Sequence, residues 1–446
     1  MVTVSRTTDA ATLVIVGAGP AGMMAAIAAA EAGQGVRSPD DVRRLAPSSP
    51  RVVLLEQLDR PGAKLLVTGG GRCNLTNTLR PEAFMAHFGR LGRFMAPALA
   101  ALDSHGLREL LNGLGVPTHV REGHSVYPAS ESAKDVLAAL RHRLKALGVE
   151  ERHGVRVTGL RLEEAKPHRS AEPPRRVLRG VETAKGHLDA ERVIVATGGR
   201  SYPALGATGA GYEIARQAGH TIVEPTPGLV PLVTRQTWPG ELAGVSLPQA
   251  RVWIDLPKCS KAGVTGPVLF THTGLSGPAV LDLSGDVAAM LARRETVPIR
   301  LDFVPGTSAH DWLARFDAWQ AAGGAKMIGE LLADEVPRSV AKLLCELAGV
   351  RPSDRPTYVS RGLRRTLAAL LAGASLEVTG TEGFDKAMVT RGGVSLQQVD
   401  PRTLGSKRLP GLYFAGEVLD LDGPSGGFNL QWAFSSGYLA GLSAAK

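Results

Sequence analysis

Residues 13–33, LVIVGAGPAGMMAAIAAAEAG, constrain the fold of this chain more than any other stretch. An apolar run of four residues leads into glycines at G-x-G-x-x-G spacing and then into an alanine-rich segment. This pattern predicts a buried strand that turns tightly into a helix, the nucleotide-binding unit of a Rossmann-type α/β domain. The helix N-terminus would offer unpaired N–H groups to a pyrophosphate. We therefore expect a dinucleotide to contact Gly17, Gly19, Pro20, Ala21 and Gly22.

Length and composition indicate a globular protein of more than one domain. A chain of 446 residues predicts roughly two or three domains. Hydrophobic residues make up 44% and charged residues 21%, and no apolar run reaches the length of about 20 residues that a membrane span needs. Residues 1–11 lack the basic region and apolar core of a secretory signal. We therefore expect a cytoplasmic protein.

The cysteines and the charge exclude some classes of function. Cys73, Cys259 and Cys345 are far apart in the sequence and form no C-x-x-C pair, so neither a disulfide framework, a redox dithiol nor a zinc site is indicated. We expect no metal site. The net charge of +9 permits anionic partners, but the basic residues are scattered, which does not favour a nucleic-acid partner.

A second apolar strand is predicted at residues 51–57, ending at Glu56. An acidic residue at this place accepts hydrogen bonds from the adenosine ribose in dinucleotide-binding folds. Residues 34–50 are rich in Pro, Ser and charge and are predicted to be an inserted surface loop, which accounts for the long spacing from the glycines. We predict that Glu56 binds the ribose; a surface glutamate at a strand end is the alternative.

Residues 61–77, PGAKLLVTGGGRCNLTN, contain three consecutive glycines beside polar and positively charged side chains. Consecutive glycines are a costly choice for an ordinary linker, so a ligand approaching the backbone is the better explanation. We expect Lys64, Gly71, Arg72, Cys73 and Asn74 to contact the cofactor. For Lys64, contact with a phosphate or anchoring of the loop is preferred to a Schiff base. For Cys73, a buried thiol packed against the cofactor is preferred to a catalytic nucleophile.

The middle of the first domain is predicted to be mainly helical up to about residue 148, followed by strands at 155–160, 177–183 and 193–196. The last strand ends in Thr-Gly-Gly, which would deliver backbone to a ligand at the carboxyl edge of the sheet. We expect Val155, Thr197 and Gly198 to contribute to the cofactor site.

From residue 201 the sequence changes to short strand candidates separated by Pro and Gly turns, which predicts an inserted antiparallel β-barrel over residues 201–305. A helical subdomain is predicted over 306–373 and a strand that returns to the barrel over 374–385. His272 lies in a glycine-rich loop before an expected helix near Gly277. It is the candidate general acid or base, and a structural histidine is the alternative.

The C-terminal part, residues 386–446, repeats the pattern of the N-terminus. A buried strand at 411–419 is followed by the loop DGPSGG and by a helix predicted at 428–442. A glycine-rich loop at a helix start makes a second electropositive cradle, suited to the pyrimidine edge of a flavin. Glu417 would bind the ribityl hydroxyls. We expect cofactor contacts from Gly416, Glu417, Gly427, Phe428, Asn429 and Leu430.

Two cradles in one chain favour FAD over a nicotinamide dinucleotide, which needs one. We therefore predict FAD, bound by residues 1–200 and 386–446. No second complete G-x-G-x-x-G follows a predicted strand, so tightly bound NAD(P)H is not expected. Its transient use as an electron donor stays open.

At the level of motifs, the chain resembles the bacterial BaiN/YhiN-type flavoproteins, also described as aminoacetone-oxidase-like. The matching stretches run through nearly the whole chain: VIVGAGPAG at 14–22, PGAKLLVTGGGRCNLTN at 61–77, ATGG at 196–199, FTHTGLSGP at 270–278, and RGGV at 391–394 through FNLQWAFSSG at 428–437. This resemblance implies a glutathione-reductase-like FAD-binding domain, an inserted barrel, a helical subdomain, noncovalent binding of FAD and oxidoreductase activity.

The resulting functional hypothesis is an FAD-dependent oxidoreductase that transfers hydride to or from a small molecule. The reaction would be either oxidation of an amine or alcohol or reduction of an activated C=C bond, with His272 and Arg72 as candidate catalytic residues. An FAD-dependent RNA-modifying enzyme and a non-catalytic FAD-binding protein are the alternatives. The sequence leaves open the redox partner and the oligomeric state.

Overall fold

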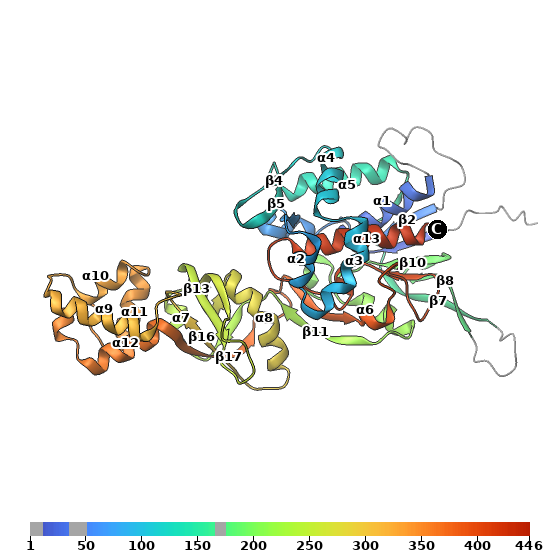
Figure 1. Cartoon of the computed structure of the whole chain (residues 1–446). Helices are drawn as coiled ribbons and strands as arrows, with labels where there is room; N and C mark the ends of the chain where they lie inside the picture. The colour runs from blue at the N-terminus through green and yellow to red at the C-terminus, as the bar shows by residue number, and fades with distance from the viewer. Residues whose placement is uncertain (1–11, 35–50, 166–174) are drawn as a thin grey trace, which may run out of the picture. The chain divides into compact units, whose positions relative to one another are not determined.

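The computed structural model describes residues 12–34, 51–165 and 175–446, which form two compact units (Figure 1). Unit 1 contains the described residues up to Pro225 together with Val389–Lys446, and unit 2 is Thr226–Met388. The N-terminal segment 1–11, most of the predicted insertion at 34–50 and the centre of the loop at 165–176 lie outside the described residues.

Unit 1 is built around a five-stranded parallel sheet with the strand order β19-β10-β1-β2-β6. Its strands β1, β2, β10 and β19 are almost wholly buried, which is why their sequences are continuous apolar runs. Some neighbours in the sheet come from distant parts of the chain, as Ile194 pairs with Tyr413. The bounds are β1 Thr12–Val16, β2 Arg51–Leu55, β6 Glu150–Arg152, β10 Arg192–Val195 and β19 Leu412–Phe414.

Helices α1 (Pro20–Gln34) and α13 (Phe428–Ala444) pack closely against each other in unit 1 (Figure 1). Their small residues make this possible. A Cβ atom on Gly437 would lie 2.2 Å from the carbonyl oxygen of Ala21, and one on Gly441 would lie 2.3 Å from that of Ala25. Glycine in α13 therefore brings the helix that begins at the second glycine-rich loop against the helix that begins at the first.

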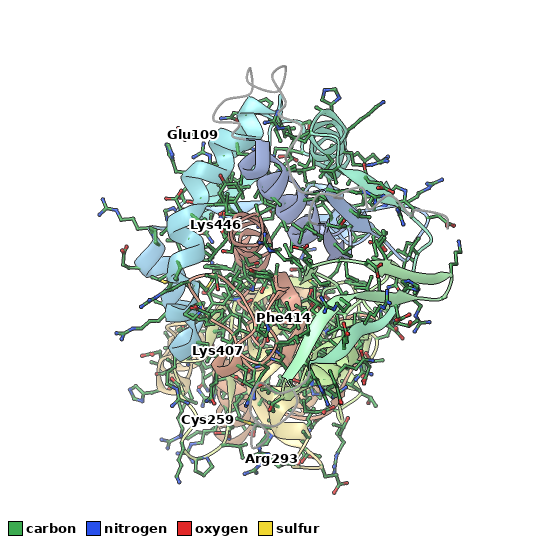
Figure 2. The ribbon with its side chains drawn as sticks, turned by 90° about the vertical axis from the view of Figure 1, so that its right-hand side faces the viewer. Glu109, Cys259, Arg293, Lys407, Phe414 and Lys446 are labelled. Atoms are coloured by element: carbon green, nitrogen blue, oxygen red, sulfur yellow. The ribbon has the colours of Figure 1, made fainter. Side chains whose placement is uncertain are left out.

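The predicted strand at 411–419 is shorter in the structure. It ends at Phe414 and is followed by the 3-10 turn η8 (Gly416–Val418), because Gly416 has a φ of +77° that an extended strand does not adopt. The turn carries Glu417 out of the sheet. Phe414 itself is fully buried in unit 1 (Figure 2).

The remaining elements of unit 1 surround the sheet. Two three-stranded antiparallel sheets are present, with orders β3-β5-β4 and β7-β8-β9. The predicted ribbon at 155–183 corresponds to the second of these. The bounds are β3 Thr76–Asn77, β4 Thr118–Val120, β5 Ser125–Pro128, β7 Val157–Ala165, β8 Arg175–Thr183, β9 Gly186–Asp189, β18 Val389–Val394, α2 Pro81–Ala86, α3 Ala96–Ala101, α4 Ser104–Gly113, α5 Ala133–Ala146 and α6 Ala210–Gln217. Strand β11, Ile222–Gly228, begins in unit 1 and ends in unit 2.

Unit 2 contains a closed antiparallel barrel with the strand order β12-β15-β14-β13-β16-β17, which confirms the predicted fold class. Four helices, α9 to α12, form a second part of the unit with the barrel's strands beside them (Figure 1). The bounds are β12 Leu232–Thr234, β13 Ser246–Ile254, β14 Val264–Phe270, β15 Gly274–Ser276, β16 Val297–Asp302, β17 Ala374–Thr381, α7 Trp238–Glu241, α8 Pro278–Leu291, α9 Ala309–Ala322, α10 Ile328–Ala333, α11 Arg338–Leu347 and α12 Arg361–Gly373.

The stretch from residue 201 to Pro225 belongs to unit 1, although the sequence assigned residue 201 to the inserted barrel. Ser201 is fully buried and its backbone N–H donates to Thr390 Oγ1 at 3.1 Å. Helix α6 contacts β7 of unit 1. Buried polar contacts and helix packing, which composition does not report, therefore place the boundary near residue 225.

Among the described helices, none combines the length and the apolar character that crossing a bilayer requires.

Candidate functional site

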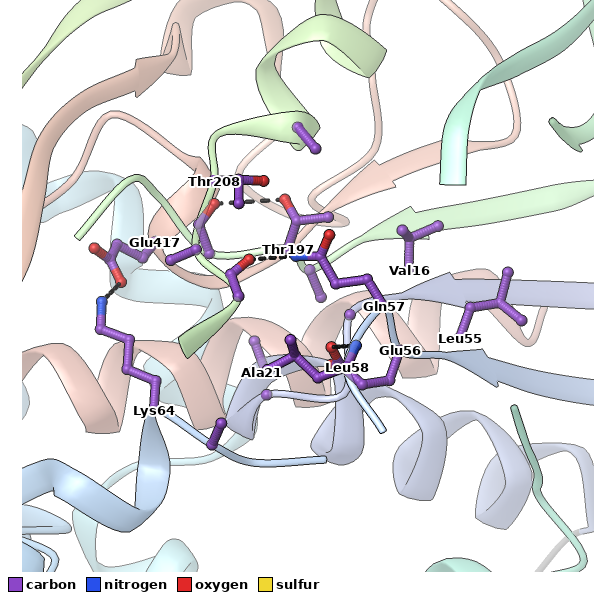
Figure 3. Close-up of a pocket in the computed structure, with 18 of the residues that line it drawn as sticks. Val16, Ala21, Leu55, Glu56, Gln57, Leu58, Lys64, Thr197, Thr208 and Glu417 are labelled. Carbon is purple, nitrogen blue, oxygen red and sulfur yellow. Dashed lines mark hydrogen bonds and ion pairs between the residues drawn. The ribbon is translucent and has the colours of Figure 1, made fainter. Parts of the chain in front are cut away.

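A cleft in unit 1 opens at the carboxyl ends of the parallel strands, where open α/β sheets bind their ligands (Figure 3). Ten of the residues predicted to bind the cofactor line it: Gly17, Gly19, Pro20, Ala21, Glu56, Lys64, Val155, Thr197, Gly198 and Glu417. The structure thus brings together side chains and backbone from six separate stretches of sequence.

The three glycines of the first loop have different roles. A Cβ atom on Gly22 would lie 1.8 Å from the carbonyl oxygen of Gly17, so Gly22 allows the helix to contact the turn. Gly17 has a φ of +102° and lies against Ala196. A Cβ atom on Gly19, in contrast, would meet nothing within 4 Å. The protein itself leaves this space open at the N-terminus of α1, where a phosphate group would fit.

Glu56 points into the same loop from the end of β2. Its carboxylate accepts hydrogen bonds from the backbone N–H groups of Ala18 and Leu58, both at 2.9 Å. Figure 3 shows the carboxylate beside Leu58 at the edge of the cleft. A carboxylate oxygen can accept more than one bond, so Glu56 keeps capacity for a ribose hydroxyl.

One wall of the cleft was not predicted from the sequence. It consists of the loop before α6 and the start of that helix. Gln57, which follows β2, contacts this loop, because its Nε2 donates to the carbonyl oxygen of Gly206. The G-A-G at residues 209–211 was the available signal, but Gly211 lies against Thr197 in the protein core. The unpredicted lining residues here are Leu205, Gly206, Ala207, Thr208, Ala210 and Ile214.

Lys64 and Glu417 form an ion pair in the cleft, with Nζ 2.6 Å from Oε2 (Figure 3). Lys64 Nζ also donates to Ser201 Oγ at 2.6 Å. The other carboxylate oxygen of Glu417 accepts from Ser201 Oγ and from the backbone N–H of Thr390, both at 2.7 Å. Lys64, predicted to contact a phosphate or to anchor the loop, and Glu417, predicted to bind the ribityl chain, therefore contact each other. The charge of each is balanced within the protein.

The triple-glycine loop is shaped by left-handed backbone. Gly69, Gly70 and Gly71 have φ values of +56°, +67° and +87°, and Cys73 follows with +64°. Three consecutive positive φ angles require glycine for conformational reasons, independently of any ligand. Cys73 is fully buried, and this burial raises the pKa of its thiol to about 12. The protonated, inaccessible thiol matches the preferred interpretation of a packed side chain.

Arg72, by contrast, is exposed at the end of this loop. Its Nε donates to the carbonyl oxygen of Gly69 at 3.1 Å, and its guanidinium carbon lies 5.8 Å from the ring centroid of Tyr127. Arg121 lies over the same ring at 5.0 Å and pairs with Glu131. In the described part of the chain, the terminal nitrogens of Arg72 have no protein acceptor.

The two glycine-rich loops predicted to hold the flavin ring contact each other. Asn77 Nδ2 donates to the carbonyl oxygen of Gly426 at 3.2 Å. A Cβ atom on Gly427 would lie 2.5 Å from the carbonyl oxygen of Thr76. With its amide group reoriented, Asn74 also accepts from the N–H of Gly427 at 3.3 Å. Residues about 350 positions apart thus form one continuous surface.

At the start of α13 the side chains are engaged within the protein. Phe428 is buried against Phe84, at a centroid distance of 4.9 Å, and against His87, at 4.6 Å. Asn429 bonds twice to the backbone of Gly423, at 2.8 Å in each case. The backbone N–H groups of Phe428, Asn429 and Leu430 have no acceptor within the helix, so they remain available to a ligand.

His272 is in unit 2, in the turn between β14 and β15, and its side chain is exposed. The predicted helix begins at Pro278, one residue after Gly277. The neighbouring Thr273 Oγ1 donates to Glu382 Oε1 at 2.9 Å. The residues predicted to bind FAD all belong to unit 1, so the structure does not bring His272 together with them within one unit.

No group of three or more His, Cys, Asp or Glu side chains suited to a metal ion occurs among the residues that the structure describes.

The amino-acid sequence is similar to a known protein family and to characterised proteins. Residues 11–443 match the HI0933-like protein Rossmann domain. The chain is 34% identical over 433 residues to a 3-dehydro-bile acid delta(4,6)-reductase of Clostridium scindens, covering 97% of this chain and 98% of the relative. It is 30% identical over 438 residues to a ribosomal RNA dihydrouridine synthase of Haemophilus influenzae, with the same coverage.

Among solved structures, the fold is similar to that of 3-ketosteroid-delta4-(5alpha)-dehydrogenase from Rhodococcus jostii RHA1. The TM-score is 0.52 at 18% identity, and the alignment covers 100% of this chain and 98% of the other. The match over nearly the whole length, together with the cleft and the paired glycine-rich loops, confirms the resemblance inferred from the motifs: the chain belongs to the HI0933-like family of Rossmann-fold flavoprotein oxidoreductases.

Proposed function

We propose that this protein is an FAD-dependent reductase of a carbon–carbon double bond conjugated to a carbonyl group. The observation that carries the proposal is the cleft at the N-terminus of α1. Among the three glycines of the first loop, Gly19 alone has unoccupied space where a side chain would be. This cleft fits a dinucleotide pyrophosphate, and the second glycine-rich helix start lies in the same unit.

The relatives support the choice of reaction. One is named for reducing a delta(4,6)-unsaturated 3-dehydro bile acid, and the other for making dihydrouridine, which is uridine with its ring C=C bond reduced. In both, the double bond is conjugated to a carbonyl group. Reduction of such a bond is therefore preferred to oxidation of an amine or alcohol.

The residues present would hold FAD along the cleft and its continuation. The loop of Gly17, Gly19, Pro20 and Ala21 would bind the pyrophosphate and Glu56 the adenosine ribose, with Val155 at the adenine end. Lys64 and Glu417 would lie beside the phosphates and the ribityl chain. When bound, the flavin would supply the hydride equivalent for the reduction. Backbone would approach the flavin ring at Gly71, Thr197, Gly198, Gly416 and the start of α13.

Arg72 is the residue we propose to stabilise charge on the substrate. Hydride addition to a conjugated C=C bond places negative charge on the carbonyl oxygen, and N–H donors aimed at that oxygen lower the barrier. The Nε of Arg72 is held by Gly69, which leaves its terminal nitrogens as donors. His272, an exposed residue of unit 2, stays the candidate general acid or base that the sequence predicts.

The reaction can be tested by anaerobic absorbance spectroscopy of the purified holoprotein. NADH or NADPH should bleach the flavin, and a 3-keto-Δ4 steroid or another conjugated enone should then restore its absorbance while being reduced. Flavin bleached by an amine and restored by oxygen alone would instead support an oxidase. A colourless protein that takes up no FAD would refute the proposal.

A second candidate has the same chemistry with uracil in ribosomal RNA as the substrate. It is favoured by the dihydrouridine synthase relative, and the net charge of +9 permits an anionic substrate. Incubation of the reduced holoprotein with unmodified ribosomal RNA, followed by mass spectrometry of the nucleosides, tests it. A gain of two mass units on uridine, absent without reductant, is the expected result, and unchanged uridine would exclude it.

A further inference from the structure

We infer that the helical part of unit 2 carries an RNA-binding surface formed by Arg355, Tyr358, Arg361 and Arg365. We call it the Tyr358 surface. The choice of RNA as partner rests on the second candidate function above, whereas the surface itself is argued from exposure and charge.

The central residue is an exposed aromatic ring. Tyr358 ends the 3-10 turn η6 (Pro356–Tyr358), and it is 76% exposed, the most exposed of the large hydrophobic residues that the structure describes. Its backbone N–H donates to the carbonyl oxygen of Arg355 at 2.9 Å. A large ring held in solvent loses apolar burial, so a partner that covers it gains stability.

The segment that presents Tyr358 is anchored to the bundle. The neighbours Pro356 and Val359 are both buried. The carbonyl oxygens of Pro352 and Asp354 accept hydrogen bonds from the first residues of α10, at 3.0 and 2.9 Å. The ring is therefore displayed by an ordered turn, and ordering it on binding costs little conformational entropy.

The charge around the ring is strongly biased. Residues 351–365 contain five arginines and a single acidic residue, Asp354. Two of these arginines are engaged within the protein. Arg364 is buried on the inner face of α12 and bonds to Asp317 at 2.5 Å, and Arg351 bonds to Asp354 at 3.0 Å.

The other three arginines are exposed, and no acidic partner is found for them in the described part of the chain. Arg361 and Arg365 are four residues apart and so lie on one face of α12. Arg355 lies three residues before Tyr358. The structure thus separates arginines used for folding from arginines left for a partner, and the latter lie on both sides of the exposed Tyr358 in the sequence.

This combination fits single-stranded or looped RNA. Arginine side chains bind phosphates, and an exposed aromatic ring stacks on an unpaired base regardless of its identity. An acidic protein would meet the charges but has no need of the ring, and a lipid surface would require a broader apolar patch. The surface therefore predicts binding of RNA with modest sequence preference and marked salt dependence.

The experiment is fluorescence anisotropy of the full-length holoprotein with a labelled oligouridylate of about 20 nucleotides, between about 50 and 200 mM salt. Tyr358→Ala should weaken binding roughly 5- to 100-fold through loss of stacking, and Tyr358→Phe should bind as the wild type. Arg361→Gln with Arg365→Gln should make the slope of log affinity against log salt shallower by about 1.4.

The matched control is Arg293→Gln with Arg294→Gln, two exposed arginines of the same unit that are not part of the Tyr358 surface. Arg293 is labelled in Figure 2. This control should bind the oligonucleotide as the wild type does. Equal affinity of all variants, an equal loss in the control, or binding to phosphatidylglycerol vesicles but not to the oligonucleotide would overturn the inference.

Unchanged flavin absorbance and thermal unfolding in each variant show that loss of binding is not loss of folding. Measuring RNA binding and enone reduction on the same protein tests the Tyr358 surface and the reductase activity separately. A protein that reduces enones but binds no RNA would refute the Tyr358 surface and leave the reductase intact. A protein that takes up no flavin but binds RNA through the Tyr358 surface would refute the reductase and support the surface.

Discussion

Lys64 and Glu417 are 353 positions apart in the chain, yet Lys64 Nζ lies 2.6 Å from Glu417 Oε2 in the cleft of unit 1. Each side chain is only about one-fifth exposed, at 23% and 21%. Ser201 and the backbone of Thr390 complete the hydrogen bonding of the carboxylate. The ion pair connects the N-terminal and C-terminal parts of unit 1 at the place where we propose that FAD binds.

Replacing Lys64 by Met should lower the free energy of unfolding by about 1–3 kcal/mol, because a largely buried carboxylate loses its charged partner. Flavin affinity should fall as well. Chemical denaturation and the flavin content of the purified protein measure the two effects. The control is Lys326→Met, whose ion pair with Asp334 is 63% and 64% exposed and should contribute less than about 1 kcal/mol. Equal effects in both variants would argue against a role for the cleft pair.

Gly19→Val should abolish flavin retention while leaving thermal unfolding of the apoprotein nearly unchanged, because the added atoms occupy space that is open without a ligand. Gly22→Val should instead destabilise the fold, since even a Cβ atom would lie 1.8 Å from the carbonyl oxygen of Gly17. The ratio of flavin to protein absorbance and the melting temperature distinguish the two. A Gly19→Val variant that keeps its flavin would contradict the assignment of the pyrophosphate site.

Arg72→Ala should reduce kcat with a conjugated enone by roughly 10²-fold or more with flavin retained, if its terminal nitrogens donate to the developing oxyanion. Arg72→Lys should restore little, since lysine lacks the planar fork of donors. Arg121→Ala removes the other arginine over Tyr127 and serves as the control, because Arg121 pairs with Glu131. A change in KM alone would indicate binding rather than catalysis.

Cys73 and Cys345 should resist iodoacetamide at pH 8 in the folded protein, whereas Cys259 should react. Burial raises the pKa of both former thiols to about 12, so the thiolate that reacts is scarce and inaccessible. Cys259 is partly exposed. Peptide mass spectrometry before and after unfolding measures each site. Rapid labelling of native Cys73 would reopen its assignment as a nucleophile.

The stability of unit 1 should fall in acid because of His220, which is buried and bonds to Ser406 Oγ at 2.7 Å. Burial, assisted by the charge of Arg408, lowers its pKa from 6.5 to about 4. The unfolded state then binds the proton first, so stability is lost as the pH falls from about 6.5 towards 4. The loss at pH 5 should be about 1–2 kcal/mol.

His220→Gln should flatten this part of the pH profile in denaturation experiments at constant ionic strength. His187→Gln provides the control, since the side chain of that histidine on β9 is exposed. A profile that is equally steep in the His220 variant would assign the acid sensitivity to other groups.

Local patterns in the sequence predicted the elements that hold the proposed cofactor. The apolar run at 13–16, the spacing of the first glycines and the helix that follows appear in the structure as β1, a tight turn and α1. The helix predicted at 428–442 is α13, which runs two residues further. Such elements are predictable because burial on both faces and the preference of glycine for tight turns act within a few residues.

Local sequence patterns do not predict the cleft wall formed by Leu205 to Ala210 or the buried position of Ser201. Neither stretch has hydrophobic periodicity, and their place follows from contacts with Gln57 and Thr390 that lie far away in the chain. Local patterns also missed β18, whose glycines Gly392 and Gly393 adopt φ values of +93° and +133° against neighbouring backbone. Glycine in a strand weakens the local signal that identifies one.

The sequence by itself determined that this chain folds around a dinucleotide-binding strand, turn and helix, because those features depend on residue type and short-range spacing. Only the tertiary structure decided which charges meet. It paired Lys64 with Glu417, brought Thr76 against Gly427, and left Arg361 and Arg365 facing solvent while Arg364 turned inward to Asp317. These choices depend on how distant segments pack and on which charges burial forces to find a partner.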